Sequence, residues 1–215
     1  MKHPAARSIL ILYFLFDQAL CRFLLFPLMR ASFSDDAYHS LALVIRLLLL
    51  CAILFLWLPH GVKETRIDRR TLPNGIRCVL LSVLAMVCIQ SAAVFVLKEI
   101  GAVSANQIYV NTLQSEDLFR ALFEGLIYAP LCEEIVFRDT LISEINALIH
   151  PKAGVLLSCV LFGLLHFAGA SLTQFVFIPL YALCGYILAL CHRRSGSLVY
   201  AMGAHFILNL LAMLV

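Results

Sequence analysis

The chain alternates long apolar stretches with short polar loops over most of its length. A helix needs about 20 apolar residues to cross roughly 30 Å of hydrocarbon, and several stretches reach or approach this length. We expect membrane spans near residues 9–28, 41–58, 78–97, 126–146, 155–167 and beyond, 172–191 and 198–215. The pattern therefore predicts an all-α fold, a polytopic transmembrane helical bundle of about seven spans.

Composition excludes the main alternative classes. Hydrophobic residues make up 62% of the chain and charged residues only 13%, against about 25% charged in soluble domains. The net charge of +3 is too small to indicate a nucleic-acid partner. No repeat, linker or low-complexity tract divides the sequence, so we expect a single integral membrane domain over residues 1–215, with the lipid bilayer as its surroundings.

The first apolar stretch has an alternative interpretation as a cleaved signal peptide, because Lys2 and Arg7 precede it. That stretch is long for a signal peptide, contains Asp17 and Arg22, and lacks a clear cleavage pattern of small residues. We therefore favour a membrane span, and loss of the segment would leave six spans.

Loop charges predict the orientation of the bundle. Basic residues fill alternate loops, at Lys2 and Arg7, at Lys63, Arg66, Arg69, Arg70 and Arg77, at Lys152, and at Arg193 and Arg194. The intervening loops are mainly acidic. The positive-inside rule then places the amino terminus in the cytoplasm. Short loops are typical of prokaryotic proteins, so we expect a multi-pass protein of a bacterial inner (cytoplasmic) membrane.

Two adjacent acidic residues, Glu133 and Glu134, lie inside an otherwise apolar helical stretch. Ionisable groups at membrane depth cost at least a few kcal/mol each, so they usually face a polar cavity and mark a functional site. Glu134 and Arg138 are four residues apart in the favourable order for an ion pair on one helix face. Glu133 points about 100° away from Glu134, where its carboxylate can activate a water.

Two histidines, His166 and His205, fall inside later predicted spans, and each has a partner four residues away on the same helix face. The pairs are Phe162 with His166 and His205 with Asn209. Counted from the cytoplasmic helix ends, Glu133, His166 and Asn209 lie at depths of roughly 21, 20 and 18 Å. Either histidine alone is more often a structural hydrogen-bond partner, but the shared depth predicts one site.

Three short motifs thus follow one another on successive hydrophobic segments. They are E-E-x-x-x-R at Glu133, Glu134 and Arg138, F-x-x-x-H at Phe162 and His166, and H-x-x-x-N at His205 and Asn209. In this order and membrane context they resemble the CAAX-protease and bacteriocin-processing (CPBP) family of intramembrane proteases. The resemblance covers residues 124–215.

The resemblance implies a helical bundle with a water-filled chamber. It also implies hydrolysis of a peptide bond close to the carboxyl end or the membrane segment of a membrane-associated protein or peptide. By position, Glu133 would be the general base with His166 assisting it, and His205 and Asn209 would stabilise the oxyanion. Glu134, Arg138 and Phe162 would be supporting residues. The sequence does not select a particular substrate.

A zinc mechanism competes within the same residues, because Glu133, His166 and His205 are an acceptable ligand set with one position open for water. The sequence lacks H-E-x-x-H, and Asn209 suits an oxyanion better than a metal. We therefore expect metal-free glutamate catalysis with no cofactor.

Two further classes of membrane protein are alternatives to a protease. One is a non-proteolytic membrane protein, such as a bacteriocin-immunity or scaffold protein, and the other is a proton-coupled transporter. All motif positions are present, and the paired repeats of many transporters are not visible. The protease is the favoured hypothesis.

Other polar and small residues within the spans receive structural interpretations. Asp17, Arg22 and Arg46 can line the same chamber. Arginine can also extend its side chain to the interface, and Asp17 can pair with Arg22, so we favour a structural role for these residues. Gly163 and Gly203, near the two histidines, are expected to let helices approach closely.

Overall fold

The computed structural model describes residues 4–99, 101–149, 153–167 and 172–214. These residues are almost all helical, and none of them forms a β-strand, which confirms the all-α prediction. In chain order the elements are α1 (Pro4–Leu15), η1 (Phe16–Leu25), α2 (Phe26–Ser32), α3 (Asp35–Gly61), η2 (Val62–Thr65), α4 (Leu72–Glu99), α5 (Ala105–Glu116), α6 (Leu118–Leu122), η3 (Phe123–Tyr128), α7 (Ala129–Glu134), η4 (Ile135–Leu141), α8 (Ile142–Leu148), α9 (Ala153–Leu165), η5 (Leu172–Val176), α10 (Phe177–Ser195) and α11 (Leu198–Met213).

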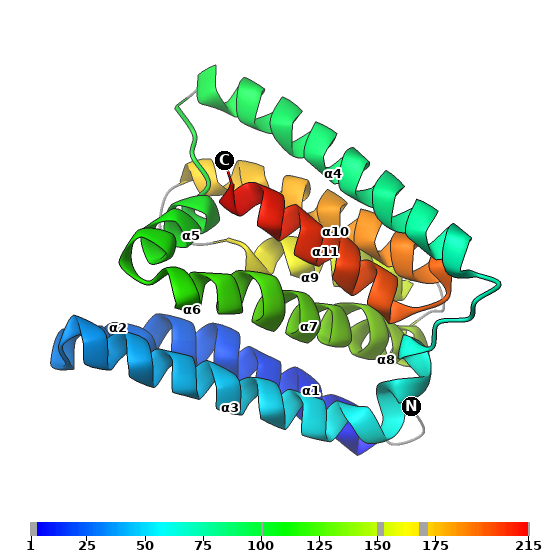
Figure 1. The fold of residues 1–215 in the computed structure, drawn as a ribbon, viewed down its shortest axis with the longest axis horizontal. Helices are drawn as coiled ribbons and strands as arrows, with labels where there is room; N and C mark the ends of the chain where they lie inside the picture. The colour runs from blue at the N-terminus through cyan, green and yellow to red at the C-terminus, as the bar shows by residue number, and fades with distance from the viewer. Residues whose placement is uncertain (1–3, 100, 150–152, 168–171, 215) are drawn as a thin grey trace.

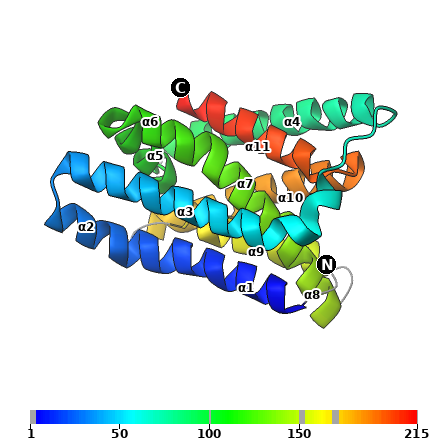
Figure 2. The same ribbon diagram turned by 60° about the horizontal axis from the view of Figure 1, so that its bottom comes forward.

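The helices are stacked in layers (Figure 1). Residues 4–61 fold into a helical hairpin, here called the N-terminal hairpin, which packs against the helix running from Leu118 to Leu148. On the other side of that helix lie α9, α10 and α11, and α4 covers α10 and α11. Figure 2 shows the same order from a second direction. The helix that carries the predicted acids is therefore central.

Four helices are long and apolar enough to cross a membrane. They cover Leu10–Ser32, Asp35–Pro59, Leu72–Glu99 and Thr173–Ser195. Two shorter apolar helices, Ala153–Leu165 and Leu198–Met213, accompany them. The central helix contains seven charged residues and is not among the apolar four. By these features the chain is an integral membrane protein. The expected number of about seven membrane spans stays a prediction.

The two ends of the bundle differ in charge. At one end, next to the basic loop after α3, the start of α4 meets the end of α10, where the Asn74 amide donates to the Arg194 carbonyl at 3.0 Å. At the opposite end α5 meets the end of α11, where the Gln114 amide donates to the Met213 carbonyl at 3.1 Å. We call the end with the basic loop after α3 the basic end. Lys2 and Lys152, two of the loop residues whose charge predicts the orientation, lie outside the described residues.

The N-terminal hairpin is fixed to the central helix by a shared apolar core and by buried polar contacts, one of which involves Trp57. Ile53 and Ile135 are fully buried in this core. The rings of Phe14 and Phe137 meet edge to face with centroids 5.5 Å apart. The Trp57 indole donates to the Asp139 carboxylate at 2.6 Å. These contacts hold the central helix in one rotational setting, which determines where its acidic side chains point.

Gly163 lets α9 approach α10 closely, as expected. A Cβ built on Gly163 would lie 2.4 Å from the Ile178 carbonyl oxygen and 3.1 Å from the Ala182 backbone nitrogen. The expectation for Gly203 is wrong, because a Cβ there would meet no atom within 4 Å. Of the two small residues, only Gly163 is required by helix packing.

Gly163→Ala is expected to lower thermal stability, since the backbone of α10 cannot move away from a methyl group without separating the two helices. Overpacking of this kind costs about 1–3 kcal/mol. Gly203→Ala is the matched control, because both glycines are helical and alanine at an open site gains about 1 kcal/mol of helix propensity. Melting temperatures in detergent measure both. Equal melting temperatures for the two variants would refute the packing argument.

Candidate active site

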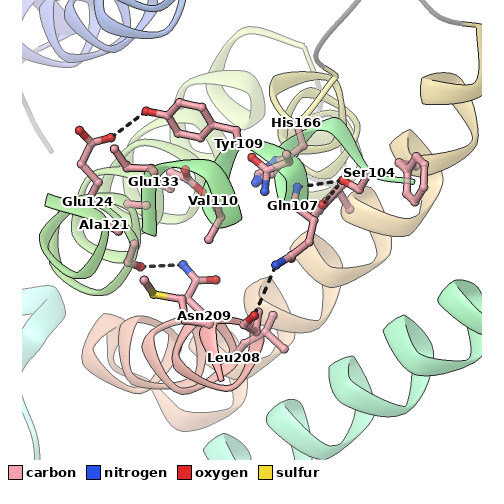
Figure 3. Close-up of a pocket in the computed structure, with 18 of the residues that line it drawn as sticks. Ser104, Gln107, Tyr109, Val110, Ala121, Glu124, Glu133, His166, Leu208 and Asn209 are labelled. Carbon is pink, nitrogen blue, oxygen red and sulfur yellow. Dashed lines mark hydrogen bonds between the residues drawn. The ribbon is translucent and has the colours of Figure 1, made fainter. Parts of the chain in front are cut away.

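A cavity of about 710 Å³ lies inside the bundle, and the four predicted catalytic side chains line it. These are Glu133, His166, His205 and Asn209. They come from three elements, namely α7, the turn after α9, and α11. Figure 3 shows Glu133, His166 and Asn209 around the cavity. The structure therefore brings together the residues that were selected by motif and depth, while their catalytic roles stay a prediction.

The central helix is locally π-helical on both sides of the two acids. Segment η3 precedes α7 and η4 follows it, so Glu133 and Glu134 end a short α-helical piece between two wider turns. Pro130 contributes to this irregularity because it has no backbone N–H to donate. Wider turns re-aim the side chains that follow, and such π segments are frequent at functional sites.

Glu134 contacts both Arg138 and His205. Its Oε2 lies 3.1 Å from Arg138 Nε, which is the ion pair that the four-residue spacing predicts. Its Oε1 lies 3.0 Å from His205 Nδ1 on α11. A carboxylate only accepts hydrogen bonds, so Nδ1 of His205 is the donor. Glu134 thereby fixes the orientation of the imidazole.

Glu133 is left free to act on a ligand. It is buried, and its Oε2 makes no hydrogen bond to a described residue. The Nε2 atom of His205 lies 3.9 Å from Glu133 Oε2. The carboxylate and the imidazole are therefore close to each other but too far apart for a direct hydrogen bond. Both can bind a third group in the cavity.

Phe162 occupies the middle of the site. Its ring lies 4.6 Å from the Arg138 guanidinium carbon, a cation–π contact. The same ring lies 6.1 Å from the ring of His205 and 4.7 Å from that of His166. Phe162 therefore spaces the two imidazoles and covers the buried charge of Arg138. This explains in physical terms why a phenylalanine accompanies the histidine in the F-x-x-x-H motif.

His166 lies in the turn directly after α9 and not inside the helix, which ends at Leu165. Its Nδ1 lies 2.9 Å from the Phe162 carbonyl. Because a carbonyl only accepts, Nδ1 carries the proton and Nε2 carries the lone pair in the neutral ring. The ring stacks on Tyr181 at 4.3 Å with an interplanar angle of 16°. His166 is thus held with its basic nitrogen available.

Asn209 lies one turn beyond His205 on α11. Its Nδ2 donates to the Gly125 carbonyl at 2.8 Å, a bond that Figure 3 shows. The amide has two N–H groups, so one donor is left for a ligand in the cavity.

Helix α5 also contributes to the site, which no motif in the sequence indicated. Ser104 caps α5 by accepting from the Gln107 N–H at 3.4 Å. The Ser104 hydroxyl also lies 2.9 Å from the Tyr181 hydroxyl. Because Tyr181 stacks on His166, the hydrogen bond between the Ser104 and Tyr181 hydroxyls helps to hold the imidazole of His166 in place. No spacing signal in the sequence connects these residues.

A second polar network lines the cavity and was also missed. Asp17 forms an ion pair with Arg46 and accepts from the Tyr128 hydroxyl at 2.7 Å. The pairing of Asp17 with Arg22 is therefore wrong. Arg46 Nε also lies 3.7 Å from Glu124 Oε2, and Arg120 Nε donates to Glu124 Oε1 at 2.6 Å. The network joins the N-terminal hairpin to the central helix.

The network continues toward the end of the bundle opposite the basic end. Nη1 of Arg120 lies 3.1 Å from His39 Nδ1, and His39 Nε2 lies 3.8 Å from Glu116 Oε2. Arg30 Nη2 lies 2.5 Å from Glu116 Oε1. Hydrogen bonding to this guanidinium lowers the pKa of Glu116. Charges along this path are thus largely neutralised in pairs.

The choice between metal-free catalysis and a zinc mechanism stays a prediction. Within the described residues, no group of three His, Cys, Asp or Glu side chains is placed to hold a metal ion. His205 Nδ1 is engaged by Glu134, and His166 Nδ1 by a backbone carbonyl, so each ring is oriented through Nδ1 and keeps Nε2 for a ligand.

Fold and site together define a class, an integral membrane protein of helices with a buried acid and histidine site. Residues 116–211 match the family model described as "Rce1-like: Type II CAAX prenyl endopeptidase Rce1-like". All three motifs lie in this range. The match confirms the resemblance of this segment to the CAAX protease family. Neither the curated proteins nor the solved structures gave a match.

Proposed function

We propose that the chain is an intramembrane endopeptidase that hydrolyses a peptide bond in a membrane-anchored protein or peptide. The single observation that carries this proposal is the cavity, which the free carboxylate of Glu133 lines together with two oriented imidazoles, His166 and His205. The family match supports the same activity class. A water bound in the cavity is the nucleophile.

The geometry supports a general-base mechanism. Glu133 accepts a proton from the water while the water oxygen forms a bond to the substrate carbonyl carbon. The lone pair on Nε2 of His166 holds the same water in place. The Glu133 proton then passes to the amide nitrogen as the C–N bond breaks. Atoms and charges balance with water as the only co-reactant.

Negative charge on the tetrahedral intermediate requires donors placed in advance. Asn209 has a free amide N–H, and His205 in its protonated form donates from Nε2. The Glu134 carboxylate accepts from Nδ1 and holds the imidazole of His205 in place, as in a histidine held by a buried acid. Arg138 balances the charge of Glu134.

The side from which substrate enters follows from the cavity and the loop charges. The cavity is lined at Lys98, Gly101 and Val103, near the end of the bundle opposite the basic end, and these residues are exposed. With the amino terminus in the cytoplasm of a bacterium, substrate reaches Glu133 from the extracytoplasmic side. The substrate is then an exported or outer-leaflet peptide.

The proposal is tested with purified protein in liposomes and a lipid-anchored fluorogenic peptide. Cleavage is expected, and it should persist after treatment with a strong chelator, because the oriented residues supply base and oxyanion donors without a metal. Elemental analysis of the same preparation should find less than stoichiometric zinc. Loss of cleavage on chelation with recovery by zinc would contradict the metal-free mechanism, and no cleavage under any condition would contradict the function.

A further inference from the structure

A second cavity, of about 610 Å³, lies between α9 and α10, and side chains from residues 155–160 and 178–193 line it. We call it the α9–α10 groove. It shares none of its described lining residues with the active-site cavity. On α10, Tyr181 and Cys184 line the active-site cavity, whereas Ala182 and Leu183 line the groove. The two cavities therefore lie on different faces of α10.

The groove has apolar walls and opens toward lipid. Leu156 and Val160 on α9 are exposed, as are Leu183 and Tyr186 on α10. These residues belong to apolar helices of an integral membrane protein, so the open side of the groove meets hydrocarbon and not water. In a bilayer an acyl chain fills such a groove, because an empty one would leave its lining atoms without packing contacts on one side.

One end of the groove carries a positive charge. Val155 near the start of α9 and Arg193 near the end of α10 both line the groove, and the neighbouring Arg194 belongs to the basic end. Arg193 is exposed, and none of the ion pairs among the described residues includes it. Within the described lining residues it is the one charged side chain. A guanidinium binds two oxygens of a phosphate group, and basic pockets between membrane helices bind the head groups of anionic lipids.

We propose that the α9–α10 groove binds one anionic phospholipid from the leaflet at the basic end, with its phosphate at Arg193 and an acyl chain along the groove. At a rise of about 1.5 Å per residue, the part of α10 from residue 178 to residue 193 is roughly 22 Å long. One leaflet contributes about 15 Å of hydrocarbon, so the groove can hold an acyl chain over the full depth of that leaflet.

The bound lipid stabilises the contact between two helices that hold the active site. It packs against α9, which His166 follows directly, and against α10, which carries Tyr181. Tyr181 stacks on the imidazole of His166, so separation of α9 from α10 would disturb this ring. The lipid site itself does not depend on the proposed endopeptidase function.

Lipid titrations of the purified full chain in detergent test the site, with melting temperature and native mass spectrometry as readouts. Phosphatidylglycerol should raise the melting temperature and stay bound as one molecule per chain. Phosphatidylcholine, which carries the phosphate without a net negative charge, should bind about fivefold more weakly, the usual effect of one basic residue at an anionic lipid. Arg193→Gln should weaken phosphatidylglycerol binding about fivefold. Arg194→Gln, the exposed neighbour that does not line the groove, should keep the affinity of wild type.

A second pair of variants tests the apolar wall. Val160→Trp places an indole in the groove and should abolish phosphatidylglycerol binding at concentrations that saturate wild type. Leu164→Trp, one turn further along α9 at an exposed position outside the groove, should leave binding unchanged. Equal losses in Arg193→Gln and Arg194→Gln would overturn the head-group site, and wild-type binding by Val160→Trp would overturn the groove. Inorganic phosphate should not shift the melting temperature, and a shift equal to that with phosphatidylglycerol would overturn the proposal in favour of a free anion.

Discussion

Glu133→Gln is expected to reduce kcat by about 10²–10⁴-fold, the usual contribution of a general base. The amide has nearly the same shape as the carboxylate but cannot accept the proton of the attacking water. Cleavage of the lipid-anchored peptide in liposomes measures this effect. Since Glu133 Oε2 makes no hydrogen bond to a described residue, the substitution removes no internal contact of that oxygen.

The folded state is therefore expected to persist in Glu133→Gln, with a melting temperature at least equal to that of wild type. Glu99→Gln is the matched control, because Glu99 is an exposed acid at the end of α4. It should retain both activity and stability. Full activity of Glu133→Gln would rule out the proposed base, and a collapse of the melting temperature would show that Glu133 is structural.

Arg138→Met is expected to damage both stability and activity. Glu134 and Arg138 are fully or almost fully buried, and their contact is 3.1 Å. Removing one partner leaves a buried charge uncompensated, which costs about 3–5 kcal/mol. For a chain of this size the melting temperature should fall by about 10 °C. Arg77→Met, at an exposed position of α4, is the control.

The double variant Glu134→Gln/Arg138→Met separates the two roles of the pair. Stability should partly recover, because no unpaired charge is left in the core. Activity should stay low, since His205 has then lost the carboxylate that accepts from its Nδ1. If Arg138→Met melted at the temperature of Arg77→Met, the buried ion pair would be irrelevant to stability. Recovery of activity in the double variant would show that Glu134 does not orient His205.

Features that repeat along one helix could be predicted from the sequence. Apolar stretches of the right length predicted the membrane helices, and a spacing of four residues predicted the contact of Glu134 with Arg138. Helix rise alone placed Glu133, His166 and Asn209 at one depth, and the cavity contains all three.

Contacts between helices could not be predicted in this way, because they depend on how each helix is rotated and which helix is its neighbour. Glu134 and His205 are 71 residues apart, and no local pattern joins them. The same reason explains the error for Asp17, which pairs with Arg46 on α3 and not with Arg22 on its own helix. For Gly203, a helix position alone did not reveal that the site faces open space.

The central claim is that Glu133 activates a water and does not itself attack the substrate. A single turnover with enzyme in excess in H₂¹⁸O, followed by mass spectrometry of product and enzyme, tests it most directly. We predict one ¹⁸O atom in the new carboxylate of the cleaved peptide and none in the Glu133 side chain. An ¹⁸O label in the Glu133 carboxylate would indicate a covalent acyl intermediate and contradict the general-base mechanism.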